Sequence, residues 1–275
     1  MTSIDSSVST TLSEAELRRF AESGYAVVRG LFTADEIAEI CDEFAAIKAG
    51  GPVPHHFNPQ PQVDGAPYDA LREYPRVMFP DQFSPLARRY LLDARLNAIL
   101  EDLLGEEVLA AQSMFYFKPP GAKGQALHQD NFYLKVEPGT CVAAWVACDV
   151  IGRDNGGLEV VPGTHAMDLF CPEEADSSVS FTREYVPPPP GLEAVPVDMR
   201  PGDVLFFNGS LVHGSGPNVS ERFRRSFICH YVGASTARIS TSYPTMRMNG
   251  ERIHLDASVG GGPCGTEYDS AGSPH

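Results

Sequence analysis

The stretch from Gln125 to Asn131 contains two side chains that could bind a metal ion. His128 and Asp130 stand two positions apart, just before the aromatic pair Phe132 and Tyr133. If this stretch is a β-strand, alternate side chains share a face, so the imidazole and the carboxylate point the same way. Two His and one carboxylate make the facial triad of mononuclear non-haem iron sites. His128 and Asp130 therefore predict two thirds of such a site, and a third ligand must come from elsewhere.

His213 is the candidate for the third ligand. It follows the apolar run 203–207 and precedes Gly214, as expected of a ligand at the end of a strand. The gap from Asp130 is 213 − 130 = 83 residues, which leaves room for intervening strands. Three protein ligands leave open positions on an octahedral ion, and mixed imidazole and carboxylate ligands of this kind favour Fe(II). Structural zinc usually takes four protein ligands. The three residues are therefore predicted to be both the metal ligands and the catalytic centre.

A binding residue for an anion is expected close to this centre. If 223–231 is a strand, Arg224 and Ser226 share one face while Arg225 takes the other. A guanidinium group binds a carboxylate bidentately, and a hydroxyl on the same face can assist it. Arg224 and Ser226 are therefore predicted to hold a carboxylate, whereas Arg222 is interpreted as part of a solvated basic patch.

The first hundred residues predict helices around one short strand. Residues 1–11 are expected to be a disordered arm, and Ser13 with Glu16 forms a capping box for the first helix. The other predicted elements are a strand over 25–30, a helix over 34–48 capped by Thr33, and helices near 84–93 and 95–104. Between them, 50–75 is a long loop rich in Pro, Gly, His and Asn. Because long loops in compact domains are commonly functional, we expect it to contribute to the substrate wall through Phe57, together with Phe132 and Tyr133.

From residue 107 onward the sequence predicts short strands separated by turns. The runs are 107–118, 125–135, 140–150, 157–161, 193–198, 203–207, 210–213 and 223–233. This pattern indicates an all-β sandwich or barrel that needs the flanking helices to cover it, within a single domain spanning 1–275. The segment 240–275 has few apolar runs and is expected to be irregular.

Composition limits the partners. The net charge is −15 and the pI about 4.9, so the surface repels nucleic acid and anionic membranes, and a small molecule is the expected substrate. No segment is apolar over the length needed to span a bilayer, and the N-terminus lacks the pattern of a signal peptide. The six cysteines show no CxxC, and Cys141, Cys148 and Cys229 are expected to be buried thiols. We expect a cytoplasmic protein; monomer and homodimer both remain open.

With these motifs in place, the chain resembles the phytanoyl-CoA dioxygenase family of Fe(II)/2-oxoglutarate-dependent oxygenases. The resemblance rests on the order and spacing of several motifs. These are the opening 12–32, the His128-Gln129-Asp130 pair, the run from Asp154-Asn155-Gly156-Gly157 to Pro162-Gly163-Thr164-His165, and His213-Gly214-Ser215-Gly216-Pro217-Asn218 with Arg224. In relatives the Arg that binds 2-oxoglutarate lies eleven residues after the distal His, and 213 + 11 = 224, which agrees with the assignment from strand parity.

The resemblance implies a fold and a set of cofactors. The fold is mainly β, a double-stranded β-helix (a cupin-like jelly roll) over 107–235, packed by the N-terminal helices. The cofactors are Fe(II), 2-oxoglutarate as cosubstrate and O2. The resemblance also implies that Ser215 and Trp145 line the 2-oxoglutarate pocket, and that Gln112 and Tyr116 on the preceding strand touch it.

The implied reaction is oxidation of an unactivated C–H bond of a small molecule, with release of succinate and CO2. In related halogenases a small residue replaces the metal-binding carboxylate, so Asp130 favours hydroxylation over halogenation. Desaturation, demethylation and ring formation stay open, and a natural-product intermediate of secondary metabolism is the preferred substrate. The alternatives are a cupin-type isomerase or hydrolase and a non-catalytic ligand-binding protein on the same fold.

Overall fold

The N-terminal helices begin at the residues that the sequence predicts. The computed structural model describes residues 11–258. Ser13 and Glu16 form the capping box that opens the first helix, which ends at Gly24 with a φ of 83°. Thr33 and Glu36 repeat this arrangement at the second. In each box two backbone N–H groups that would otherwise lack partners are satisfied, so these starts are fixed locally.

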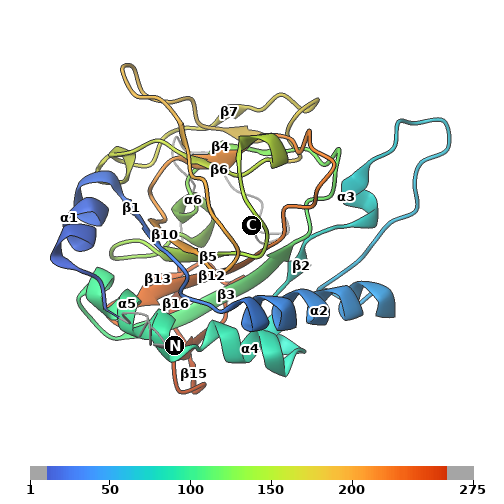
Figure 1. The fold of residues 1–275 in the computed structure, drawn as a ribbon. Helices are drawn as coiled ribbons and strands as arrows, with labels where there is room; N and C mark the ends of the chain where they lie inside the picture. The colour runs from blue at the N-terminus through green and yellow to red at the C-terminus, as the bar shows by residue number, and fades with distance from the viewer. Residues whose placement is uncertain (1–10, 259–275) are drawn as a thin grey trace, which may run out of the picture.

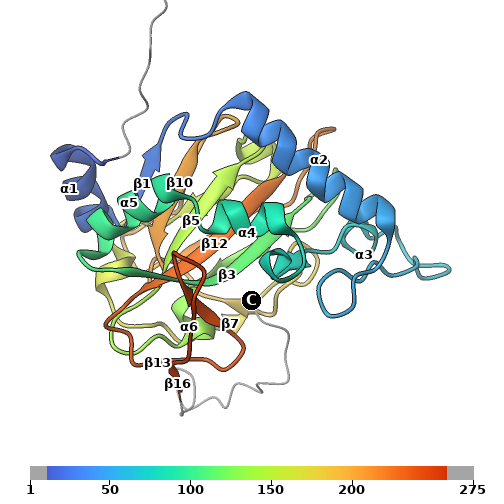
Figure 2. The same ribbon diagram turned by 90° about the horizontal axis from the view of Figure 1, so that it is seen from below.

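The remaining helices are short, and most lie close to their predicted positions. The α-helices are α1 (Glu14–Ser23), α2 (Ala34–Gly50), α3 (Ala70–Glu73), α4 (Pro85–Leu91), α5 (Ala94–Leu104) and α6 (Asn131–Leu134). The 3-10 turns are η1 (Pro80–Gln82), η2 (Arg153–Asn155) and η3 (Thr164–Ala166). Figure 2 shows α2, α4 and α5 lying together across one face of the large sheet.

The large sheet has eight strands. Its order is β1-β10-β5-β12-β3-β14-β15, with β2 pairing β3 off this path. The strands are β1 (Tyr25–Val28), β2 (Val77–Met78), β3 (Val108–Tyr116), β5 (Val142–Ala147), β10 (Val204–Asn208), β12 (Ser226–Gly233), β14 (Thr245–Arg247) and β15 (Arg252–Ile253). Its pairings are all antiparallel.

The second sheet lies on the side of the large sheet away from α2 and α4 (Figure 1). Its order is β4-β11-β6-β9, from β4 (Gln125–His128), β11 (His213–Ser215), β6 (Leu158–Val160) and β9 (Val195–Pro196). Two small pairs complete the strands: β7 (Glu173–Glu174) with β8 (Glu184–Tyr185), and β13 (Arg238–Ile239) with β16 (Asp256–Ala257). Two facing antiparallel sheets with helices outside one of them confirm the predicted jelly-roll fold.

Alternation along the strands divides the interior into two apolar layers. On β3, Phe115 belongs to the core between the large sheet and the helices, whereas its neighbour Met114 belongs to the core between the two sheets. On β5 the same holds for Val146 and Trp145. The helices therefore cover one face of the large sheet and leave the other to build a site.

Three predictions about elements were wrong. The strand predicted over 125–135 ends at His128, because Asp130 has helical angles (φ −59°, ψ −36°) and starts the single turn of α6. The strand predicted over 210–213 begins only at His213, since Leu211 N donates to Asn208 O in a turn. The segment after 240 is not irregular throughout: β14 pairs with β3 and extends the large sheet. Most of the predicted arm 1–11, and 259–275, lie outside the described residues.

Two further expectations can be compared with the structure. Cys141, Cys148 and Cys229 are buried free thiols, as predicted. Within residues 11–258, none of the helices combines the length and the apolar character needed to cross a bilayer.

The contact between α2 and the large sheet gives a stability prediction. Phe44 on α2 is fully buried and stacks on Phe115 of β3, with ring centroids 3.9 Å apart. Phe44→Ala should lower the free energy of unfolding by about 3–5 kcal/mol, because the lost ring leaves a cavity. Denaturant unfolding checks this, with Asp42→Ala on the exposed face of the same helix as control. A loss below about 1 kcal/mol would mean that α2 does not anchor the fold.

Candidate metal and anion site

Strand pairing brings the two predicted histidine ligands together. His213 at the start of β11 lies opposite His128 at the end of β4, and their ring centroids are 4.3 Å apart. The two strands approach closely beside this pair. A Cβ on Gly214 would lie 2.8 Å from Gln125 O and 2.9 Å from Leu127 N, so a larger residue there would push the strands apart. The glycine after His213 therefore allows β4 and β11 to approach closely enough to bring the two histidines together.

Asp130 reaches the same point from the turn that follows β4. Its Oδ1 lies 3.4 Å from His128 Nε2 and 3.5 Å from His213 Nε2. All three side chains are at most 4% exposed, and one ligand atom from each lies within 4.8 Å of the others. The predicted triad is thus assembled in space, although Asp130 does not share a strand with His128. Its helical backbone turns the carboxylate back toward the imidazoles.

Backbone carbonyls fix the orientation of both imidazoles. His128 Nδ1 lies 2.7 Å from Ala126 O and His213 Nδ1 lies 2.9 Å from Leu211 O. Each Nδ1–H therefore donates to a carbonyl two residues earlier, which leaves Nε2 with a lone pair for a metal. Burial lowers the pKa of His213 to about 4, against the opposing charge of Asp130, so this ring is neutral at neutral pH. Burial alone would raise the pKa of Asp130, but the imidazoles around it hold it well below its usual range.

The donor set fits a divalent transition metal. Ligand atoms about 2.1 Å from a first-row ion, in octahedral or tetrahedral arrangement, lie about 3.0–3.4 Å from each other. The Nε2–Oδ1 distances of 3.4 Å and 3.5 Å are close to this range. Two neutral imidazoles and one carboxylate on one side of a cavity match the facial arrangement of non-haem iron, with room left for other ligands.

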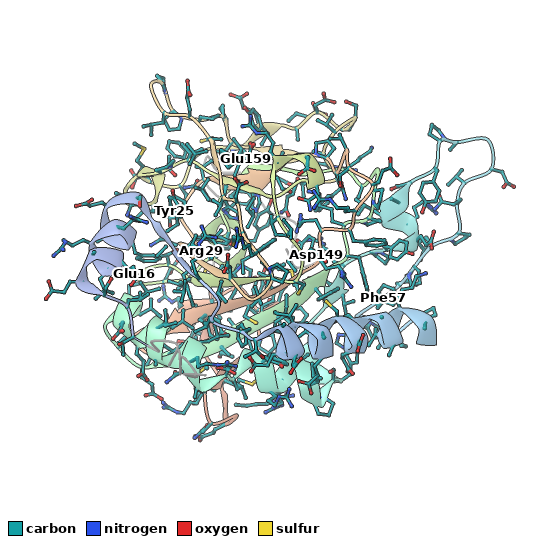
Figure 3. The ribbon with its side chains drawn as sticks, in the orientation of Figure 1. Glu16, Tyr25, Arg29, Phe57, Asp149 and Glu159 are labelled. Atoms are coloured by element: carbon teal, nitrogen blue, oxygen red, sulfur yellow. The ribbon has the colours of Figure 1, made fainter. Side chains whose placement is uncertain are left out.

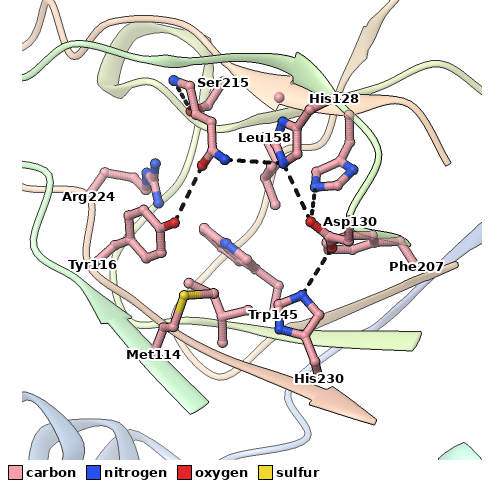
Figure 4. A pocket seen from close by; sticks show the side chains of 14 residues that line it. Met114, Tyr116, His128, Asp130, Trp145, Leu158, Phe207, Ser215, Arg224 and His230 are labelled. Carbon is pink, nitrogen blue, oxygen red and sulfur yellow. Dashed lines mark hydrogen bonds and ion pairs between the residues drawn. The ribbon is translucent and has the colours of Figure 1, made fainter. Parts of the chain in front are cut away.

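His230 on β12 is a functional candidate to which sequence reasoning gave no role. Its Nε2 lies 3.0 Å from Asp130 Oδ2, and the ring is 2% exposed (Figure 4). This hydrogen bond engages the carboxylate oxygen that faces away from His128 and His213. His230 therefore orients Asp130 so that Oδ1 is the oxygen directed at the metal position. Strand alternation is the sequence pattern that could have indicated this role. His230 stands two residues after Ile228 on β12, so the two side chains share a face, and both line the cavity.

Arg224 lies in the same cavity without a carboxylate partner among the described residues. Its Nη1 donates to Ser226 Oγ at 3.0 Å and its Nε to Gly156 O at 3.1 Å. The guanidinium carbon lies 5.3 Å from the Trp145 ring and 5.9 Å from the Tyr116 ring. Burial lowers the pKa of Arg224 to about 10, since its charge has lost water without gaining a counter-ion. Such a group is prepared for an anionic ligand.

Arg225 has a different environment. It forms a bidentate pair with Asp149, with Nη2–Oδ1 at 2.7 Å and Nε–Oδ2 at 3.0 Å. This partner raises the pKa of Arg225 and leaves it no role in the cavity. The expectation that Arg224 and Arg225 take opposite faces therefore agrees with the structure, although both residues precede the first residue of β12.

Lys118 supplies a second buried positive charge near Arg224. Its Nζ donates to Ser215 Oγ at 2.9 Å, Gly156 O at 3.0 Å and Gly216 O at 2.6 Å. Burial and the nearby Arg224 charge hold its pKa well below the usual range. The Gly156 carbonyl accepts from both cations, and this residue has a φ of 72° while a Cβ would lie 2.6 Å from Lys118 Nζ. The first glycine of the Asn-Gly-Gly motif is therefore needed at this position, because a larger residue would clash with Lys118 and would disfavour this backbone conformation.

The other predicted site residues have varied positions. Trp145, Tyr116 and Ser215 line the cavity with the triad and Arg224 (Figure 4). Ser226 and Gln112 do not line it: Ser226 accepts a hydrogen bond from the Arg224 guanidinium, and Gln112 lies opposite His230 on the neighbouring strand. Gln125, which received no role from the sequence, also lines the cavity and places its Nε2 3.2 Å from His128 Nε2.

The three predicted substrate-wall aromatics do not line this cavity. Phe57 is 1% exposed, packs in the helix-side core with Phe44, and lies close to α2 in Figure 3. Phe57 thus lies in the core and away from this cavity, and its role as a substrate contact stays a prediction. Phe132 and Tyr133 on α6 belong to a separate apolar cluster, and the Tyr133 ring lies 6.2 Å from that of His128.

Comparisons with known proteins identify the family and the fold of this chain. The family model of phytanoyl-CoA dioxygenase (PhyH) matches residues 20–226. The peroxisomal phytanoyl-CoA dioxygenase of Mus musculus is 31% identical over 241 residues, covering 82% of this chain and 70% of the relative. A probable phytanoyl-CoA dioxygenase of Caenorhabditis elegans is 33% identical, and the match covers 51% of this chain and 48% of the relative. The epimerase SnoN, solved with Fe3+, alpha ketoglutarate and nogalamycin RO, has a TM-score of 0.64 at 22% identity, covering 90% and 95% of the two chains.

The lowered pKa of His213 predicts a pH dependence of the metal-free protein. The ordinary His pKa is about 6.5, and the folded value is about 4. Between these values the unfolded chain binds a proton that the folded chain does not, so stability falls as pH drops through this window. The full effect is about 3 kcal/mol. Denaturant unfolding at pH 7 and pH 4.5 should show a smaller difference in His213→Gln than in the wild type.

The control for this experiment is His254→Gln, which changes an exposed histidine. It should keep the wild-type pH dependence. An unaltered dependence in His213→Gln would mean that His213 is not buried in neutral form.

His230 gives a prediction about metal affinity. His230→Leu removes the N–H that binds Asp130 Oδ2, so the carboxylate gains freedom and affinity for Co(II) should fall about 10- to 100-fold. His230→Gln, which keeps an N–H donor, should lose less. Competition with a chromophoric chelator measures both, and His254→Leu is the control. Wild-type affinity in His230→Leu would show that the hydrogen bond does not position the ligand.

Proposed function

The chain belongs to the phytanoyl-CoA dioxygenase family, and on this premise we propose how its site works and what it acts on. It is an Fe(II)/2-oxoglutarate-dependent dioxygenase, and we propose that it hydroxylates, or otherwise oxidises, an unactivated C–H bond of a small molecule. His128, Asp130 and His213 would hold the metal. Arg224 would bind the far carboxylate of 2-oxoglutarate, with Ser215, Tyr116 and Trp145 around the cosubstrate.

Fe(II), when bound with 2-oxoglutarate and O2, supplies the oxidation of the C–H bond, with succinate and CO2 as coproducts. The residues of the chain bind and position the reactants. Carbonyls of Ala126 and Leu211 keep the two imidazoles in the tautomer that presents Nε2. His230 keeps Asp130 aligned. Apolar side chains of Met114, Leu158 and Ile228 line the cavity and limit the access of water to the reacting centre.

One observation carries the proposal. A fully buried guanidinium without a carboxylate among the described residues lies in the same cavity as two imidazoles and a carboxylate. A cupin-type isomerase or hydrolase would need the metal ligands but would have no use for this cation. A non-catalytic binding protein would have no need for the orienting hydrogen bonds of the triad. The combined site is what an oxygenase with an anionic cosubstrate requires.

We propose a natural-product intermediate as the substrate. The similarity of fold to the epimerase SnoN, which was solved with nogalamycin RO, supports a small-molecule pocket of this kind without identifying the compound. The carboxylate of Asp130 occupies the ligand position that a halide would need, which favours hydroxylation or another oxidation without halogenation.

Replacing each of the two neighbouring arginines by leucine, in separate variants, tests the proposal. Arg224→Leu should abolish measurable 2-oxoglutarate binding, a loss of at least about 100-fold, because the carboxylate loses its bidentate partner. The same variant without 2-oxoglutarate should be no less stable than the wild type, since an unpaired buried charge has been removed. Arg225→Leu should keep 2-oxoglutarate affinity within about twofold but lose stability with its Asp149 pair. Calorimetric titration and denaturant unfolding measure these quantities.

Succinate formation tests the reaction itself. The wild type supplied with Fe(II), 2-oxoglutarate and O2 should release succinate, and His213→Ala should not. Loss of 2-oxoglutarate binding in Arg225→Leu alone would overturn the assignment of the anion site.

A further inference from the structure

A second cavity of about 180 Å³ adjoins the metal and anion site. The two cavities share the side chains of Tyr116 and Arg224 as walls. The charged side chains that line the second cavity are all cationic: Arg76, Lys118, Lys123 and Arg224. The chain as a whole carries a net charge of −15, so a cavity whose charged lining residues are all cations is a strong local exception.

Two of the other cations already have acceptors in the protein. The Nζ of Lys118 donates to Ser215 and to two backbone carbonyls. The Nζ of Lys123 donates to Ser177 O at 2.7 Å. Arg224 is assigned to the cosubstrate under the proposed function. Arg76 is the cation of this cavity that these roles leave unexplained.

Arg76 lies close to two aromatic rings that also line this cavity. It directly precedes β2, whose Val77 pairs with Phe115, so Arg76 comes beside Tyr116 at the end of β3. Its Nη1 donates to Tyr116 Oη at 3.0 Å, and its guanidinium carbon lies 5.6 Å from the Tyr116 ring and 5.3 Å from the Phe181 ring. The two rings fix the plane of the guanidinium and keep it at the cavity.

No carboxylate pairs with Arg76 in residues 11–258. A guanidinium has five N–H donors, and one hydrogen bond to a side chain leaves most of them for a ligand. By contrast, the partly buried Arg95 pairs with both Glu36 and Asp93. A positioned guanidinium without a counter-ion, facing a cavity, is suited to bind a planar anion.

We propose that Arg76 binds a carboxylate of the substrate, so that the enzyme acts on a small carboxylic acid. The inference rests on the proposed function and adds the class of substrate. A chain of short contacts leads from Arg76 through Tyr116 to Gln125 and on to His128. Because Tyr116 is a wall of both cavities, a carboxylate held by Arg76 would lie beside the wall that also borders the metal ligands.

The competing source of a carboxylate is the cosubstrate. Trp145 and the metal ligands line only the first cavity and Arg76 lines only the second, whereas Arg224 borders both. The anion at Arg76 is thus assigned to the substrate, and the experiment below separates the two sources.

The test uses the full chain loaded with Fe(II) and 2-oxoglutarate without O2. Benzoate, phenylacetate and hexanoate, each paired with its primary amide, are titrated by calorimetry. At least one acid should bind the wild type at least about tenfold more tightly than its amide, because the amide lacks the charge that a guanidinium requires. Arg76→Gln should remove this preference, and Arg76→Lys should keep part of it. Arg183→Gln, which removes an exposed positive charge, should leave it unchanged.

Affinity for 2-oxoglutarate is measured in the same variants. It should stay within about twofold of the wild type in Arg76→Gln. The inference is overturned if no acid binds more tightly than its amide in the wild type, or if Arg76→Gln keeps the preference. It is also overturned if Arg76→Gln loses 2-oxoglutarate instead. Failure of the wild type to bind 2-oxoglutarate would contradict the proposed function. Absence of the acid preference from a wild type that binds 2-oxoglutarate would contradict only the role of Arg76, so the two failures can be told apart.

Discussion

The antiparallel pairing of β4 with β11 is the constraint on which the site depends. It places His128 directly opposite His213, although 85 residues (213 − 128) separate them in the chain. The pair lies on the sheet that faces the large sheet, so the imidazoles project into the space between the two layers. Gly214 keeps the strands at the required distance. If the register slipped by one residue, one imidazole would turn to the opposite face and the triad would be lost.

Unpaired charge is the second property that organises this cavity. Arg224 and Lys118 are buried near each other, and both donate to the Gly156 carbonyl. Each also donates to a serine hydroxyl, Arg224 to Ser226 and Lys118 to Ser215. Arg225, one residue away, is neutralised by Asp149 on the other side of the strand. A cavity that keeps its cations free of carboxylates selects anionic ligands before any specific contact forms. The same reasoning extends to Arg76, which the aromatic rings hold at the neighbouring cavity.

The helices contribute by covering the opposite face of the large sheet. On β5 and β12, residues of one parity pack in the core on the helix side, and residues of the other parity face away from the helices. Because the helix side is filled by large rings such as Phe44 and Phe115, the site side can keep a polar cavity without loss of the fold. Strands carry His128, His213 and His230, whereas Asp130 lies on the turn after β4 and Arg224 lies just before β12.

The sequence by itself determined the capped helices, the two-layer β fold and the four side chains His128, Asp130, His213 and Arg224. These follow from local patterns: capping boxes, alternation, and motifs in which neighbouring residues act together. It did not determine that Asp130 leaves the strand, that β14 joins the large sheet, or that Phe57 folds into the core. It also gave His230, Gln125 and Arg76 no role, because each acquires one only from a partner on another segment. Tertiary structure decided these points, since pairing between distant strands and the burial of a charge depend on which segments come together, and no local pattern records that.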